Sequence, residues 1–143
     1  MDPPQPRNEN HRTMTLVFAK ERTEAGIREA LLARRTVVWA ADQLAGPRAV
    51  LEPLVRACIA IDPPHHADKR SVWAQMRNLS DVPFALRRTG ATGPETLRLP
   101  AGKVILLKLP AAPGTTAQLD YVVENACSAP GEPLAVSWRV KAP

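Results

Sequence analysis

Residues 15–39 hold the pattern that most constrains how this chain can fold. The run TLVFAKERTEAGIREALLARRTVVW predicts a buried strand over residues 15–19, a helix capped by Thr23, and a β-branched second strand over residues 36–40. Strand–helix–strand is the repeating unit of α/β proteins, and its parallel strands need neighbours on both flanks. Only fourteen residues precede the run, and they are polar and rich in Pro. We therefore expect a short α/β remnant of a larger domain.

The next helix is expected to be interrupted by a proline. Gly46–Pro47 is expected to open it, with Pro47 at the first helical position, where proline is favoured. Pro53 follows six residues later, and an interior proline costs ~3 kcal/mol. The sequence therefore predicts a short turn over residues 47–52 and a helix that restarts at Pro53.

Beyond residue 70 the apolar residues alternate with polar ones, which is typical of half-buried antiparallel strands. Five or six such strands, with turns rich in Pro and Gly, predict a small antiparallel β-sandwich. The preceding stretch DPPHHADKR reads as a linker. The predicted fold class is α+β: a disordered arm (residues 1–13), an α/β segment (14–62), a linker (63–70) and a β-sandwich (71–143).

Composition excludes several classes of function. The net charge is +5, but the 19 Lys and Arg residues are spread along the chain and only six residues are aromatic, so we expect no nucleic-acid partner. No apolar run is long enough to span a membrane, and the N-terminus lacks the apolar core of a signal peptide. A cytoplasmic protein is expected if residue 1 is the natural start, whereas a longer parent could be exported.

The two cysteines, Cys58 and Cys127, have no C-x-x-C spacing. We expect both to pack as small apolar side chains, and a disulfide between them stays open.

The residues HRTMTLVFAKERTEAGIREALLARRTVVW and QLAGPRAVLEPLVRACI resemble the end of the catalytic domain in a bacterial branch of the PHP (polymerase and histidinol phosphatase) family. The later β region resembles the small C-terminal domain of those proteins. The resemblance implies relatives that are metal-dependent phosphoesterases with a distorted β/α barrel. Such relatives bind divalent metals through His-x-His and Asp-x-His motifs, and neither motif occurs here. We therefore expect no metal site, no cofactor and no catalytic residue in this chain.

Three residues are candidates for phosphate binding. Lys20 and Arg22 lie between a strand end and a helix start, where α/β proteins bind anions. His11 would approach the mouth of the barrel if the resemblance holds, although a lone histidine cannot hold a catalytic metal. The alternative for Lys20 and Arg22 is a solvated loop. The adjacent pair His65–His66 is expected to be an exposed part of the linker.

Two functions remain open from the sequence. The first is a C-terminal accessory portion of a PHP-type phosphoesterase, inactive by itself. The second is a non-enzymatic binding or assembly module; carbohydrate binding by the sandwich is a weaker third reading. In the first two, residues 14–62 would meet either the missing catalytic portion or a second copy of the chain, because Val17, Val37, Val38 and Trp39 would lie partly exposed at strand edges.

Overall fold

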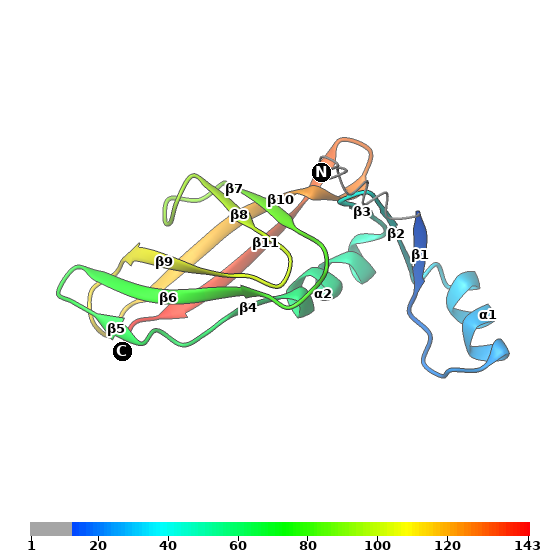
Figure 1. Ribbon diagram of the computed structural model, residues 1–143, viewed down its shortest axis with the longest axis horizontal. Helices are drawn as coiled ribbons and strands as arrows, with labels where there is room; N and C mark the ends of the chain where they lie inside the picture. The colour runs from blue at the N-terminus through cyan, green and yellow to red at the C-terminus, as the bar shows by residue number, and fades with distance from the viewer. Residues whose placement is uncertain (1–12) are drawn as a thin grey trace, which may run out of the picture.

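The computed structural model describes residues 13–143, and its strands form two sheets (Figure 1). The first has the order β1 (Met14–Val17), β2 (Thr36–Ala40), β3 (Gln43–Ala45), β10 (Thr116–Ala129), β7 (Phe84–Arg88) and β8 (Thr96–Leu99), and β11 (Glu132–Lys141) also pairs with β10. The second contains β4 (Ile59–Ile61), β6 (Ser71–Asn78), β5 (His66–Ala67) and β9 (Val104–Pro110). The two helices are α1 (Glu24–Leu32) and α2 (Arg48–Cys58).

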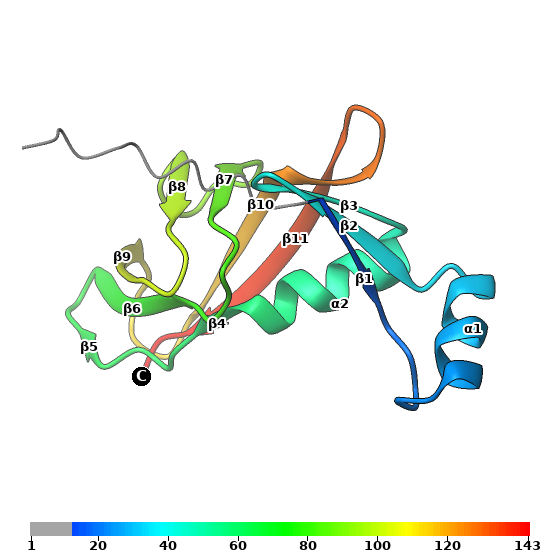
Figure 2. The same cartoon turned by 45° about the vertical axis from the view of Figure 1, so that its right-hand side comes forward.

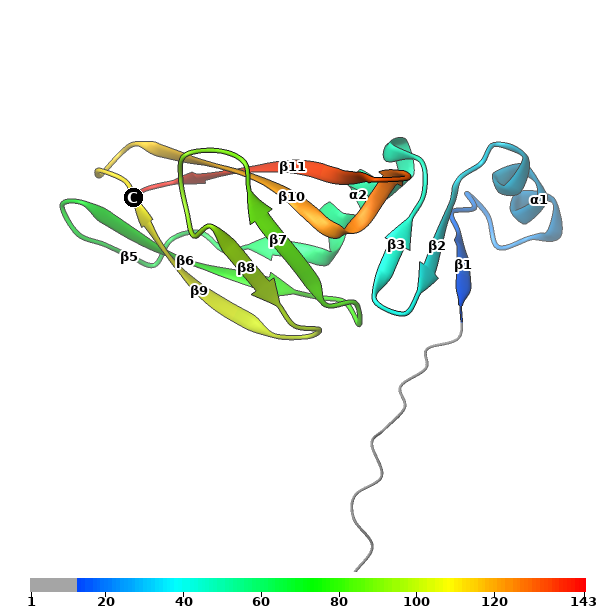
Figure 3. The same cartoon turned by 90° about the horizontal axis from the view of Figure 1, so that it is seen from above.

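The two sheets share one hydrophobic core, as the alternating pattern predicts. Buried side chains of the second sheet include Val72, Ala74 and Met76, all 0% exposed. They belong to the same cluster as Leu119 and Tyr121 of the first sheet. The two sheets therefore pack as a β-sandwich, with the antiparallel strands β10 and β11 as its longest pair (Figure 3). The described residues contain no barrel.

The expectation of a strand–helix–strand unit with parallel strands is wrong. β1 and β2 are antiparallel neighbours, with Leu16 opposite Val37. The backbone N–H of Phe18, just after β1, donates to the carbonyl oxygen of Arg35, just before β2, at 2.9 Å. The segment that contains α1 therefore leaves and re-enters the β1–β2 pair at the same end. Arg34, with a left-handed φ of 55°, reverses the chain after the helix. α1 is therefore an insertion in a hairpin and lies at one end of the molecule (Figure 2).

The predicted break at Pro53 is also wrong, because α2 runs through it from Arg48 to Cys58. Pro47 is the residue before the first helical turn rather than the first helical residue. Leu51 and Val55 lie on either side of Pro53 and are both 0% exposed. Packing of both turns on the core holds the helix together despite the hydrogen bond that Pro53 cannot donate.

Strand pairing crosses the stretch that was expected to be a linker. Residues 63–70 contain β5, which pairs with β6, and β4 also pairs with β6. β3 joins the first sheet as a parallel neighbour of β10, with Leu44 opposite Ala126. Asp68 Oδ1 accepts hydrogen bonds from the backbone N–H groups of Arg70 and Ser71, both at 2.7 Å. These two bonds form a tight turn between β5 and β6.

The expected exposure of β2 is correct only in part. Val38 is 40% exposed, but its neighbour Val37 is fully buried in the core, because successive side chains of a strand point to opposite faces of the sheet. Within residues 13–143, no helix has the length and apolar character needed to cross a membrane.

Candidate functional site

The helix α1 carries a surface on which several large apolar side chains are exposed. Thr23 caps the helix as predicted, and its Oγ1 accepts a hydrogen bond from the Gly26 N–H at 3.0 Å. Glycine is required at position 26 because a Cβ there would lie 2.5 Å from the carbonyl oxygen of Glu21. The preceding loop therefore folds tightly against the first turn of the helix.

The end of α1 is held to the sheet by one arginine. Arg35 Nε donates to the carbonyl oxygen of Phe18 at 3.0 Å, and its two terminal nitrogens form hydrogen bonds with both carboxylate oxygens of Glu29. The hydrogen bond from Arg35 keeps the pKa of Glu29 below its usual value. This bidentate pair fixes the direction of the helix relative to the end of β1.

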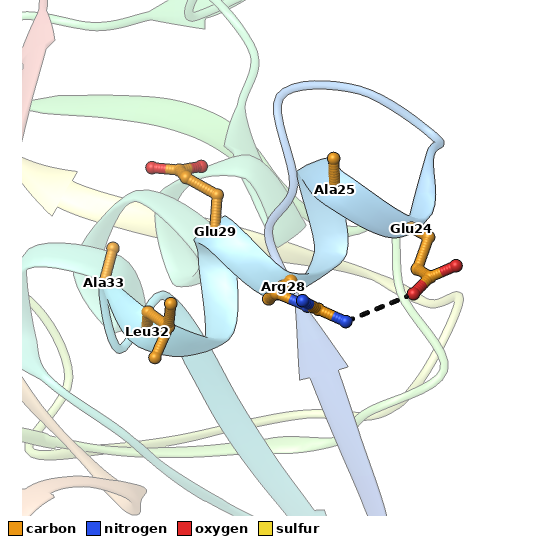
Figure 4. Close-up of a pocket in the computed structure, with 6 residues that line it drawn as sticks. All are labelled: Glu24, Ala25, Arg28, Glu29, Leu32 and Ala33. Carbon is orange, nitrogen blue, oxygen red and sulfur yellow. Dashed lines mark hydrogen bonds and ion pairs between the residues drawn. The ribbon is translucent and has the colours of Figure 1, made fainter.

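The apolar side chains of α1 are only partly covered. Ala30 is buried, but Ile27, Leu31 and Leu32 are 45%, 50% and 80% exposed. Figure 4 shows another side of the helix, where Arg28 reaches Glu24 at 3.3 Å in an exposed ion pair. The side chains in that view line a shallow hollow that is open to solvent. The surface of α1 is therefore an open face rather than an enclosed pocket.

The predicted phosphate-binding residues lie on the loop between β1 and α1. Lys20 and Arg22 are both exposed, on the loop position that the sequence indicated. Arg22 lies at the rim of another shallow surface hollow, together with Glu24, Ile27 and Arg28. His11 lies outside the described residues. Phosphate binding by these three residues stays a prediction.

Within the part of the chain that the structure describes, no group of three or more His, Cys, Asp or Glu side chains could hold a metal ion. His66 lies on β5, where its ring centroid is 4.9 Å from that of Trp73. Lys108 lies on β9, on the other side of β6, and its Nζ is 5.3 Å from the centroid of the Trp73 ring. Both His65 and His66 are exposed, as expected, but His66 lies on a strand rather than in a linker and packs against the Trp73 ring.

Both cysteines are free thiols and are partly buried. Burial raises the pKa of the Cys58 thiol, and a hydrogen bond with Ser80 opposes this shift. A protonated, half-buried thiol agrees with the packing role expected from the sequence.

Sequence analysis missed a polar residue in the sandwich core. Asn125 is 7% exposed, and its Nδ2 donates to the carbonyl oxygens of Asp42 and Pro83, both at 2.7 Å. Asn125 lines a cleft of about 320 Å³. The other lining residues are Asp42, Gln43, Pro83, Phe84, Ala85, Arg98, Leu99 and Pro100. The only signal in the sequence is an asparagine inside the apolar run of β10. Because its amide is fully used by the backbone, Asn125 supports structure rather than ligand binding.

Comparison with solved structures finds a two-domain protein from Bacteroides vulgatus, described as containing a predicted PHP-like metal-dependent phosphoesterase. The two are 28% identical and superpose with a TM-score of 0.83; the match covers 91% of this chain and 39% of that chain. The present chain thus spans less than half the length of that protein. The resemblance to a PHP-type protein with a small β domain, expected from the sequence, is confirmed.

The search of curated proteins finds no match. A sequence profile of an Ig-like domain family matches residues 59–139, which is more than half of the chain. These residues run from β4 to β11 and contain the second sheet together with β7, β8, β10 and most of β11. The chain belongs to this family of Ig-like domains.

Proposed function

We propose that this chain acts as the C-terminal accessory portion of a PHP-type phosphoesterase and is not catalytic alone. The observation that carries the proposal is the superposition of 91% of this chain on 39% of a two-domain PHP-like protein. Most of the length of that relative lies outside the match. An Ig-like sandwich that accompanies a larger domain is suited to a supporting or positioning role.

The chemistry of the described side chains supports this assignment. Hydrolysis by a group of bound metal ions needs several His and carboxylate ligands that converge. The described residues do not fit such a set, because no three candidate ligands lie together among residues 13–143. We therefore assign this chain no role that uses the divalent metals of the resembled family.

An assay with p-nitrophenyl phosphate and Mn²⁺ or Zn²⁺ tests the proposal. We expect the purified chain to show no turnover above buffer, while the two-domain relative from Bacteroides vulgatus serves as the comparison enzyme. Activity that stays with the chain through repurification, and that a chelator removes, would show that the chain is catalytic by itself.

A second function is favoured by the outer face of the second sheet. Val104 and Leu106 are 51% and 60% exposed there, on the strand that pairs with β6, and Lys108 approaches Trp73 on the same two strands. Exposed aliphatic side chains beside a partly exposed aromatic ring are suited to protein contact. A non-enzymatic assembly module would use this face, and Leu106→Lys would then weaken its complex with a partner protein, whereas Gln75→Ala, at an exposed polar position of β6, would not.

A further inference from the structure

The strand β9 has one edge without a partner strand. Among the described strands it pairs only with β6, with Leu106 opposite Gln75 and Lys108 opposite Trp73. Figure 3 shows β9 along the margin of the molecule. Its seven residues make it longer than β1 and β8, the four-residue strands at the two ends of the first sheet. A row of unpaired N–H and C=O groups on such an edge is a template for another strand.

Hydrogen bonds at both ends of the β6–β9 pair show which backbone groups of β9 point outward. The Asn78 N–H donates to the carbonyl oxygen of Lys103 at 2.9 Å, and the Ala111 N–H donates to that of Arg70 at 3.1 Å. Along an antiparallel strand, residues that bond to the partner alternate with residues whose backbone groups point away. The odd-numbered residues of β9 therefore bond to β6, and the even-numbered residues point their N–H and C=O groups away from it.

The even-numbered residues of β9 before Pro110 are Val104, Leu106 and Lys108, and we call these three the β9 edge. Val104 and Leu106 are 51% and 60% exposed, and Lys108 is exposed as well, whereas Leu107 between them is buried. Pro110 ends the open stretch because it has no N–H to donate. The outward backbone groups are therefore bordered by two large apolar side chains and the stem of one lysine.

The longest outer strand, β11, is protected in a way that β9 is not. β11 pairs only with β10, and α2 lies beside it. Arg56 Nη1 donates to the carbonyl oxygen of Ser137 at 2.9 Å, and Arg48 Nη2 donates to that of Ala135 at 3.3 Å. Side chains of α2 thus occupy two carbonyl groups of β11. No side chain of residues 13–143 makes such a bond to the β9 edge, which stays open to another strand.

We propose that the β9 edge pairs with the β9 edge of a second copy of this chain, antiparallel and centred on Leu106. The inference names a partner for the assembly role proposed above for the outer face of the second sheet, and it rests on that role. A two-fold axis at Leu106 sets Leu106 against its own counterpart, and Val104 against Lys108 of the other copy. All three residues point their backbone groups outward, so each opposed pair can exchange both of its N–H···O bonds.

A second copy is the occupant because the β9 edge is complementary to itself in this register. Leu106 meets Leu106, and Val104 covers the stem of Lys108, so exposed apolar surface of both copies leaves water. The two Lys108 positions lie four residues apart along the paired strands, about 14 Å at ~3.4 Å per residue, and salt screens charges beyond ~8 Å. A register centred on Lys108 would instead set two ammonium groups against each other. The charge pattern therefore specifies one register.

Hydrogen exchange of single amides tests the pairing in the wild-type chain. An edge of this length falls in the class of small, transient interfaces below ~1,200 Å², and we expect a Kd of about 100 μM. Between about 50 μM and about 1 mM protein, NMR should show exchange of the Leu106 and Lys108 amides slowing about threefold, which is the dimer fraction expected for that Kd. The Leu107 amide, which bonds to β6, is the control and should exchange slowly at both concentrations. Rates of Leu106 and Lys108 that do not depend on concentration would overturn the proposal.

Matched variants separate edge pairing from packing of one sheet face on another. In sedimentation at about 1 mM, Leu106→Lys should be monomeric, whereas Gln75→Lys should dimerise like wild type. Gln75→Lys adds the same charge to the same face, but on β6 and away from the edge. A dimer that both variants lose would indicate packing between faces and overturn the edge pairing. Circular dichroism checks that each variant is folded.

A charge exchange tests the register. Val104→Lys sets two lysines against each other across the proposed axis and should weaken the dimer at least tenfold. Adding Lys108→Glu to it creates an opposite-charge pair and should restore dimerisation. Failure of the double variant to recover would overturn the register. A strictly monomeric wild-type chain would overturn the pairing itself and leave both proposed functions standing, because those are measured by phosphatase turnover and by binding to a partner protein.

Discussion

The side-chain amide of Asn125 donates a 2.7 Å hydrogen bond to the backbone carbonyl of Asp42, across 83 residues of sequence. This contact joins the turn between β2 and β3 to the middle of the sandwich. The same amide donates to the Pro83 carbonyl, and its oxygen accepts from the Ala85 N–H at 3.1 Å. One buried side chain therefore connects three separate segments of backbone.

Asn125→Ala is expected to destabilise the protein by about 3 kcal/mol, because it leaves buried backbone groups without partners. Urea unfolding followed by tryptophan fluorescence measures the change. Gln75→Ala, at an exposed position of β6, is the matched control and should change stability by less than about 0.5 kcal/mol. A loss of similar size in both variants would contradict the role assigned to Asn125.

Cleavage in residues 63–70 should not separate the two parts of the chain. Lys69 and Arg70 are exposed and offer trypsin a site, but β4 and β5 pair with β6, and β3 pairs with β10, across that cut. The nicked protein should therefore elute as one species in native buffer and as two fragments in denaturant. Fragments that separate without denaturant would support residues 63–70 as a domain boundary.

Thr23→Ala should loosen α1 while leaving the core intact. Loss of the cap costs about 1 kcal/mol, and α1 lies at one end of the molecule. The expected result is faster hydrogen exchange of the Gly26 amide with little change in the urea midpoint. Thr23→Ser keeps the capping oxygen and should exchange at nearly the wild-type rate. An unchanged Gly26 rate in Thr23→Ala would show that the cap does not limit opening.

The buried phenol of Tyr121 should make the stability of the protein depend on pH in the alkaline range. Its phenol donates to the carbonyl oxygen of Pro94 at 2.6 Å, and burial raises the pKa of Tyr121, with the charge of Arg88 opposing the shift. A folded pKa above the unfolded value of about 10 means that this contribution is complete below pH 10 and is lost as pH rises through the folded pKa. Tyr121→Phe should cost about 1 kcal/mol at pH 7.

The difference between wild type and Tyr121→Phe should then shrink as the pH rises above about 10. Urea unfolding of both proteins at several pH values measures that difference. A difference that stays constant up to pH 11 would contradict the assigned titration, and a Tyr121→Phe variant as stable as wild type at pH 7 would contradict the hydrogen bond.

The sequence alone determined the sandwich and the start of α1. Alternation of apolar and polar residues specifies which side of a strand faces the core, and Val72, Ala74 and Met76 are buried as that pattern requires. The cap at Thr23 was equally local, because it depends on one hydroxyl and the next three residues. The resemblance to a PHP-type protein was also recognisable in the sequence.

Only the tertiary structure decided strand direction and the connections between the two halves. A strand–helix–strand pattern does not specify whether its strands are parallel; the reversal at Arg34 and the Phe18–Arg35 hydrogen bond make β1 and β2 antiparallel. The burial of Leu51 and Val55 kept α2 continuous through Pro53. Pairing of β3 with β10 and the contact of Asn125 with Asp42 join residues far apart in sequence. Such contacts depend on packing across the whole chain, so no local pattern predicted them.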